Sequence, residues 1–222
     1  AECGDPAGEA DEIAARLPAQ LAHVQATSPF YRELWEGVDV DGIRTADDLR
    51  RLPFTEKDDL RRSQDATPPL GGTQGAPLER IARIQCTGGT TGVPMRIGFT
   101  KSDLAWLDDV AARAVICTGA GPGDLLLECM NYSMYVGGVT DHMGFEHAGL
   151  AVLPYGVGNS LRLVELVRAM ATPWTLYSTP AYALRLAQVA REQGLEPREL
   201  RMARGIFSGE GGLQVPGFRA AI

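Results

Sequence analysis

A short run of glycine and threonine residues, within Cys86–Met95, follows a strand-like segment and constrains the fold more than any other part of the chain. Glycine lets the backbone take positive φ and approach a ligand closely, while each threonine adds a hydroxyl group. Several N–H groups of such a turn can point at one spot, which is how many proteins hold phosphate oxygens. The run therefore predicts a loop that binds the phosphates of a nucleotide, with contacts from Thr87, Gly88, Gly89, Thr90, Thr91 and Gly92.

A hairpin turn between two strands is the simpler interpretation of the same run, because residues 95–99 also have the pattern of a strand. The common phosphate motifs do not decide the matter. The pattern G-x-x-x-x-G-K-[ST] is missing, since Val93 and Pro94 follow the last glycine. The glycine-rich segment 119–124 does not have the spacing of a dinucleotide-binding motif. Both interpretations stay open at this point.

The composition is that of a soluble globular protein: 222 residues, of which 45% are hydrophobic and 22% charged. A net charge of −7 argues against nucleic acid or an anionic membrane as the partner. No C-x-x-C pair occurs among the four cysteines, which favours reduced thiols and a cytoplasmic location. The acidic N-terminus has no targeting pattern. Cys129, His142 and His147 do not have the spacing of a zinc site, so no metal site is predicted.

Two parts with different patterns divide the chain at residue 80. Residues 1–80 are predicted to form a helical appendage followed by a loop, because apolar residues recur at helical spacing within 11–35. Because of Pro18, either two short helices or one helix with Pro18 in its first turn is expected. Residues 63–80 are rich in Gly, Pro, Thr and Gln, as exposed loops are.

Strand-like and helix-like segments alternate through residues 81–222. Helices are expected at 101–117, 138–149 and 161–171, with another that begins at Pro180 behind the cap Thr179. Strands are expected at 124–130, 150–153, 174–177 and 204–207. This alternation predicts an α/β fold with a mostly parallel sheet flanked by helices.

Polar and aromatic residues gather in three of the loops that leave these strands, at 131–135, 178–182 and 208–212. Ligands of parallel sheets bind beyond the carboxyl ends of the strands. We expect the Gly/Thr loop at the same edge of the same sheet. That edge would then bind a planar ring and a phosphate together.

Several blocks, in this order, resemble the phenylacetate–CoA ligase branch of the adenylate-forming superfamily, which includes acyl-CoA synthetases and nonribosomal adenylation domains. The resemblance covers residues 13–210 and implies the first part of the large N-terminal domain of such an enzyme, with a helical N-terminal appendage. It rests on Pro29–Arg32, Leu52–Leu60, Thr87–Pro94, Gly137–Gly138, Thr179–Tyr182 and Gly205–Glu210.

The resemblance implies that the loop Thr87–Gly92 holds the β- and γ-phosphates of ATP while a carboxylate attacks the α-phosphorus. The products would be an acyl adenylate and pyrophosphate, and a thiol of CoA or of a carrier protein would then take the acyl group. Backbone N–H groups, hydroxyls and Mg²⁺ would orient the anions and spread the charge of the transition state.

The resemblance also assigns residues to the acyl substrate. Tyr132, Tyr135, Gly137 and His142 would line the acid pocket, and the loop of Ser208, Gly209 and Glu210 would lie against adenine and the acyl group. Aromatic side chains favour a flat, aromatic acid. Ordinary packing remains the alternative for both tyrosines and for His142.

Two departures from the family pattern stand out. Met95 occupies the position where many members have a lysine, and the loop 208–212 lacks the usual proline and tryptophan after the glutamate. Members of the family also continue further, into segments that carry a Mg²⁺-binding glutamate, a ribose-binding aspartate and a catalytic lysine. We therefore expect this chain to be an N-terminal portion that binds nucleotide weakly and does not turn over alone.

The first hypothesis is thus an ATP-dependent acid–thiol ligase whose partners are a small carboxylic acid and CoA or an acyl carrier protein; a homodimer is left open. A non-catalytic α/β binding module that kept the fold is the second. An amino-acid-activating domain is the third, and it would require an acidic residue in the pocket, for which Asp141 is the nearest candidate.

Overall fold

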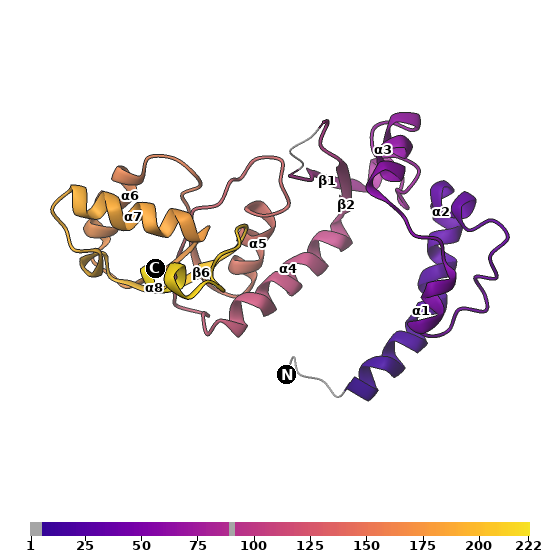
Figure 1. Cartoon of the computed structure of the whole chain (residues 1–222), viewed down its shortest axis with the longest axis horizontal. Coiled ribbons are helices and arrows are strands. Elements are labelled where there is room, and N and C mark those ends of the chain that lie inside the picture. The colour runs from indigo at the N-terminus through magenta and orange to yellow at the C-terminus, as the bar shows by residue number, and fades with distance from the viewer. Residues whose placement is uncertain (1–5, 89–91) are drawn as a thin grey trace. The chain divides into compact units, whose positions relative to one another are not determined.

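The chain divides into two compact units, Ala1–Lys101 and Ser102–Ile222, in a computed structural model that describes residues 6–88 and 92–222 (Figure 1). The boundary differs from the one expected after residue 80, because a strand hairpin that follows residue 80 belongs to the first unit. None of the helices within the described ranges is both long and apolar enough to cross a membrane.

Helices form most of the first unit, and one pair of strands ends it. In chain order its elements are α1 (Pro6–Thr27), α2 (Pro29–Leu34), a 3₁₀ turn (Asp47–Arg51), α3 (Lys57–Ala66), a second 3₁₀ turn (Leu78–Arg80), β1 (Ile81–Cys86) and β2 (Arg96–Thr100). Leu21, Trp35, Val40 and Ile43 form its buried apolar cluster.

Helix α1 continues through Pro18, which corrects the expected break. Proline removes one backbone hydrogen bond, but packing of an apolar face can hold a helix together. Leu17, Leu21 and Val24 supply that face and pack into the cluster around Trp35. The break comes instead at Ser28, which is 2% exposed and caps α2 by accepting a hydrogen bond from the N–H of Tyr31.

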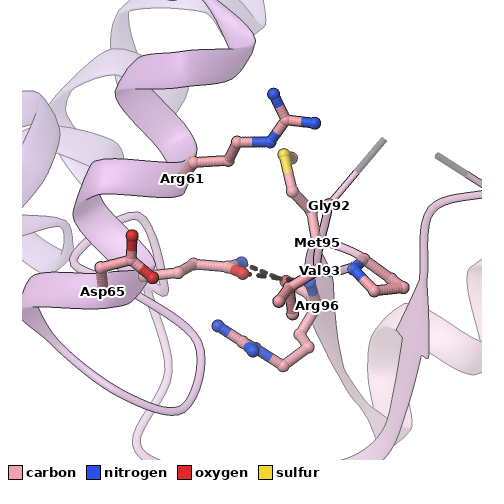
Figure 2. A pocket seen from close by; sticks show the side chains of 8 residues that line it. Arg61, Asp65, Gly92, Val93, Met95 and Arg96 are labelled. Carbon is pink, nitrogen blue, oxygen red and sulfur yellow. Dashed lines mark hydrogen bonds between the residues drawn. The ribbon is translucent and has the colours of Figure 1, made fainter. Parts of the chain in front are cut away.

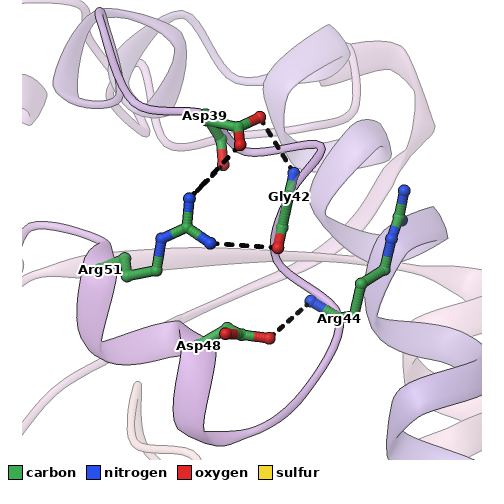
Figure 3. Close-up of polar contacts among 5 residues, drawn as sticks. All are labelled: Asp39, Gly42, Arg44, Asp48 and Arg51. Carbon is green, nitrogen blue, oxygen red and sulfur yellow. Dashed lines mark hydrogen bonds and ion pairs between the residues drawn. The ribbon is translucent and has the colours of Figure 1, made fainter.

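Polar contacts shape the turn between α2 and α3 (Figure 3). The guanidinium of Arg51 donates to the carbonyl of Gly42 at 3.1 Å and pairs with the carboxylate of Asp39 at 3.4 Å. Asp48 accepts a hydrogen bond from the N–H of Arg44 at 3.0 Å, and this bond is the main cause of the lowered pKa of Asp48. These contacts order the exposed polar side of a segment whose Val40 and Ile43 are buried in the apolar cluster.

Strands β1 and β2 run antiparallel and form a separate two-stranded sheet. The expectation that the Gly/Thr loop leaves a strand of the parallel sheet is therefore wrong. The connection 87–95 is too short for the crossover that parallel strands need, so it closes a hairpin. The simpler interpretation of the run is right about the local fold.

The second unit contains a four-stranded parallel sheet in the order β4-β3-β5-β6, as the alternating pattern predicts. Its strands are β3 (Leu125–Glu128), β4 (Ala151–Pro154), β5 (Trp174–Ser178) and β6 (Met202–Phe207). Its helices are α4 (Lys101–Cys117), α5 (Val139–His147), α6 (Ser160–Met170), α7 (Pro180–Glu192), a 3₁₀ turn (Pro197–Leu200) and α8 (Pro216–Ala221).

Two apolar clusters cover opposite faces of this sheet, because side chains of a strand alternate between its faces. Leu126 packs with α4 and α5, in a cluster that includes Val115 and Phe145. Leu127 packs with α6 and α7, in a cluster that includes Leu163 and Leu186. The result is the expected helix–sheet–helix arrangement, with the loops after β3, β5 and β6 at one edge.

Candidate functional site

The predicted site residues fall on both units. The Gly/Thr loop belongs to the hairpin of the first unit, whereas the predicted acyl and adenine residues follow β3 and β6 in the second. Gly89, Thr90 and Thr91 lie outside the described residues.

Thr87 closes the base of the Gly/Thr loop. Its N–H donates to the carbonyl of Met95 at 2.9 Å, and its hydroxyl oxygen accepts from the N–H of Met95 at 3.3 Å. The backbone N–H of Thr87 is thus engaged within the hairpin. Gly88 and Gly92 are exposed, and Gly92 has φ of +82°, which favours glycine.

A pocket of about 450 Å³ lies beside this loop, between α3 and the start of β2 (Figure 2). Its walls come from two segments: Arg61, Gln64 and Asp65 of α3, and Gly92–Arg96. The pocket therefore combines backbone of the loop with two guanidinium groups and one carboxylate, that of Asp65. Such a donor set fits an anion.

Gln64, which is 6% exposed, holds the two walls of the pocket together. Its amide nitrogen donates to the carbonyl of Arg96 at 2.6 Å, and its amide oxygen accepts from the N–H of Arg96 at 3.2 Å. Arg96 also donates through Nε to the carbonyl of Pro69 at 2.7 Å, and Arg61 pairs with Asp58 at 2.9 Å. The side chain of Met95 is only 9% exposed and belongs to the packing.

In the second unit, the loop of Ser208, Gly209 and Glu210 is tied to the loop after β5. The N–H of Ser208 donates to the carbonyl of Ser178 at 3.1 Å. The carboxylate of Glu210 accepts from the N–H of Ala181, in the first turn of α7, at 3.1 Å. Gly209 has φ of +82°. The loops after β5 and β6 therefore meet, as expected for neighbouring parallel strands.

Tyr132 and His142 are brought together, although ten residues of chain separate them. The hydroxyl of Tyr132 lies 2.9 Å from Nδ1 of His142, and the rings meet edge to face at 5.7 Å between centroids. Nε2 of His142 lies 3.0 Å from the carboxylate of Glu146. Tyr135 is half-buried in the connection between β3 and α5.

Glycine is required at the start of α5. Gly138 has φ of +74°, and an added Cβ would lie 2.5 Å from the carbonyl oxygen of Asn131. At Gly137 the nearest atom would be 3.5 Å away, a carboxylate oxygen of Asp141. The backbone at Gly138 thus packs directly on the segment that carries Tyr132.

Sequence reasoning missed Glu128, the last residue of β3. Its side chain is fully buried, and burial raises the pKa of its carboxyl to about 8. The signal was present, because Glu128 is an acidic residue in an otherwise apolar run, Leu125–Met130. Buried acidic groups with raised pKa values gather at functional sites.

Asp141 and Tyr177 complete the polar cluster at this edge. The hydroxyl of Tyr177 donates to the carboxylate of Asp141 at 2.6 Å, and burial raises the pKa of that hydroxyl. Asp141, the candidate for binding the α-ammonium group of an amino-acid substrate, thus already forms a hydrogen bond with Tyr177. Within the described ranges, no group of three or more His, Cys, Asp or Glu side chains is arranged to hold a metal ion.

Several known proteins are similar to this chain over most of its length. No family model matches the chain. The phenylacetate–coenzyme A ligase of Thermus thermophilus is 38% identical over 197 residues, which are 88% of this chain and 43% of that enzyme. The chain is a relative of the phenylacetate–CoA ligases. The enzyme of the same name from Escherichia coli K12 is 31% identical over 198 residues, 88% of this chain and 44% of that enzyme.

A solved structure with the same fold is also a CoA ligase. The chain matches 2-hydroxyisobutyryl-CoA ligase, in complex with 2-HIB-AMP and CoA, with a TM-score of 0.89 and 34% identity over 97% of this chain and 46% of that one. The family resemblance predicted from the motifs is thereby confirmed. The chain spans about half the length of the ligases that it matches.

Proposed function

We propose that this chain is part of an AMP-forming ligase that joins a carboxylic acid to the thiol of CoA. The observation that carries the proposal is the match to a CoA ligase with bound acyl adenylate and CoA over 97% of the chain. The relatives named as phenylacetate–CoA ligases support the same reaction class. They favour CoA over a carrier protein as the acceptor.

The proposed reaction has two steps, formation of the acyl adenylate and transfer of the acyl group to the thiol. A carboxylate oxygen attacks the α-phosphorus of ATP, the bond from that phosphorus to the bridging oxygen breaks, and pyrophosphate leaves with both electrons of the bond. The thiol sulfur then attacks the acyl carbonyl, loses its proton, and AMP leaves. Holding the departing phosphates in line with the carboxylate is the main task of the protein in the first step.

The loop Thr87–Gly92 would hold the β- and γ-phosphates. Exposed backbone at Gly88 and Gly92 supports this role, as does the pocket between α3 and β2. Met95 cannot supply the positive charge of a lysine. Arg61 and Arg96 line that pocket and would supply it in place of the lysine.

The acid would lie at the carboxyl edge of the parallel sheet. Tyr132 and His142 would form one wall, with Tyr135 and Gly137 from the same connection. Ser208, Gly209 and Glu210 would lie against adenine and the acyl group. The tyrosine rings favour an aromatic acid, by a margin of about 1 kcal/mol for each stacked ring.

Product analysis tests this proposal. The complete gene product that carries this chain is incubated with ATP, Mg²⁺, CoA and, in turn, phenylacetate, benzoate, indole-3-acetate and 2-hydroxyisobutyrate. We expect one acyl-CoA to form together with equal amounts of AMP and pyrophosphate. Release of ADP instead of AMP would contradict the proposed chemistry. Binding of ATP and acid without any product would support the non-catalytic binding module.

A further inference from the structure

Glu128 has an unusual position for an acidic residue. It ends β3, its side chain is 0% exposed, and its carboxyl oxygens have no well-formed hydrogen bond in the described part of the chain, although the hydroxyl of Tyr132 is within reach. Glu128 lies two residues after Leu126, so both side chains point to the face of the sheet that α5 covers. A buried carboxyl with so few polar contacts is costly unless something at the site requires it.

The groups around Glu128 come from three further segments. Tyr132 follows β3, and its hydroxyl is close enough to act on the pKa of the carboxyl. Helix α5 contributes His142, whose Nδ1 lies 3.6 Å from Oε2 of Glu128, and also Asp141. Tyr177 lies on the neighbouring strand β5, Cys129 directly follows Glu128 in the chain, and Glu146 lies further along α5.

We assign the ring proton of His142 from the hydrogen-bond partners of its two nitrogens. Glu146 is exposed and carries an acceptor, so Nε2 of His142 is the nitrogen that donates to it. Nδ1 then accepts, and the hydroxyl of Tyr132 donates to it at 2.9 Å. Nδ1 then has no proton to donate to Oε2 of Glu128, which lies 3.6 Å away. An ionised carboxylate would receive no hydrogen bond from His142 and would lie near the charge of Asp141, whereas a neutral carboxyl can donate its proton to the oxygen of Tyr132.

We infer that Glu128 is a positioning residue for the acyl pocket: as a neutral hydrogen-bond donor it holds the hydroxyl of Tyr132 on His142 and so fixes the tyrosine ring. The inference rests on the proposed function, in which Tyr132 and His142 line that pocket. Burial keeps the carboxyl neutral at neutral pH, since its pKa is raised to about 8. Ionisation of Glu128 at higher pH would release the ring.

Steady-state kinetics of the complete gene product test the inference. Between pH 6.5 and 9 we expect the KM for the acid to rise about tenfold as Glu128 ionises, while the KM for ATP changes little. The variant Glu128→Gln keeps a donor and cannot ionise, so its KM for the acid should stay near the low-pH value throughout. Glu128→Leu removes the donor and should raise that KM about tenfold at every pH, with a smaller change in kcat. Glu165→Gln, on the exposed side of α6, is the matched control and should behave as the parent.

Nuclear magnetic resonance of the His142 ring separates failure of this inference from failure of the proposed function. In this chain we expect a proton on Nε2, in the hydrogen bond to Glu146, and a shift of the ring signals, caused by ionisation of Glu128, with a midpoint near pH 8 that is absent in Glu128→Gln. If the ring signals shift as expected but no acid is turned over, the contact between Glu128, Tyr132 and His142 is supported and the proposed function is contradicted. The same midpoint in Glu128→Gln, or a proton on Nδ1, would overturn the inference. Glu128→Gln alone decides the matter if Glu128→Leu does not fold.

Discussion

The carboxylate of Glu210 accepts a hydrogen bond from the backbone N–H of Ala181, at 3.1 Å, and so joins the loop after β6 to the first turn of α7. The N–H groups at the start of a helix have no partner within the helix, and a negative charge there is favourable. One of the residues predicted to lie against adenine thus also holds two neighbouring loops together.

Replacing Glu210 should loosen this junction. We expect Glu210→Ala to lower the free energy of unfolding by about 1 kcal/mol, because the N–H of Ala181 loses a charged acceptor. Glu210→Gln should lose about half as much, since it keeps an acceptor oxygen. Urea unfolding and amide exchange at Ala181 measure both effects. Glu165→Ala, an exposed change on α6, serves as the control; equal losses in Glu210→Ala and the control would contradict the account.

The two adjacent glycines before α5 should respond differently to alanine. At Gly138 an added Cβ would lie 2.5 Å from a carbonyl oxygen, and φ is +74°. Gly138→Ala should therefore cost more than about 2 kcal/mol of unfolding free energy. Gly137→Ala, with 3.5 Å to the nearest atom, should cost less than about 1 kcal/mol. Similar losses in the two variants, measured by thermal or urea unfolding, would show that the entry to α5 is not packed as described.

Gln64 should be essential to the pocket beside the Gly/Thr loop. Gln64→Ala leaves the N–H and the carbonyl of Arg96 without their partners, so we expect a loss of about 2 to 4 kcal/mol and faster amide exchange at Arg96. Asp65→Ala changes the next residue of α3, which is exposed, and should cost less than about 0.5 kcal/mol. Unchanged exchange at Arg96 in Gln64→Ala would contradict this role.

Glu128 should make stability depend on pH. Its pKa is about 8 in the folded chain against 4.5 for the free group. A raised folded-state pKa favours folding fully below pH 4.5, and this contribution is lost as the pH rises to 8. The loss amounts to about 5 kcal/mol at most, since each pKa unit is worth about 1.4 kcal/mol.

Glu128→Gln removes that titration. The difference in unfolding free energy between variant and parent should therefore grow in favour of the variant from pH 5 to pH 8, as urea unfolding at several pH values would measure. Groups far from Glu128 are the same in both proteins and cancel in the difference. A difference that does not change with pH would mean that Glu128 is ionised at neutral pH.

Much of the second unit could be predicted from local patterns. The helix expected at 101–117 matches α4, Lys101–Cys117, because the apolar spacing and the glycine at 119 mark it clearly. Thr179 caps α7 by accepting from the N–H of Tyr182, with Pro180 in the first turn, as expected. Alternation of such helices with short strands was sufficient to predict the parallel sheet.

The hairpin shows where an inference went too far. The pattern of both strands, β1 and β2, is visible in the sequence, but the expectation that they belong to a parallel sheet is wrong, because only a short connection joins them. The length of 87–95 alone excludes a parallel pair, so the sequence contained the correction. The prediction for the N-terminal helix is wrong for another reason. Leu21 packs on Trp35 and Ile43 and so holds α1 together past Pro18, and this is a tertiary effect.

The contacts of Glu128 could not be read from the sequence. Its place in an apolar strand was visible, but its neighbours depend on how α5 lies on the sheet. Only the structure brings Nδ1 of His142 to 3.6 Å from the carboxyl and pairs Tyr132 with that histidine. The pairing of Asp141 with Tyr177 depends on the same packing.

The central claim, that the Gly/Thr loop binds the phosphates of ATP, is tested most directly by following backbone amide signals of the ¹⁵N-labelled chain during titration with Mg-ATP, AMP and tripolyphosphate. We predict that the amides of Gly88 and Gly92 shift with Mg-ATP and with tripolyphosphate but not with AMP, at millimolar ligand. Shifts of these amides with AMP alone, or none with either polyphosphate, would contradict the account.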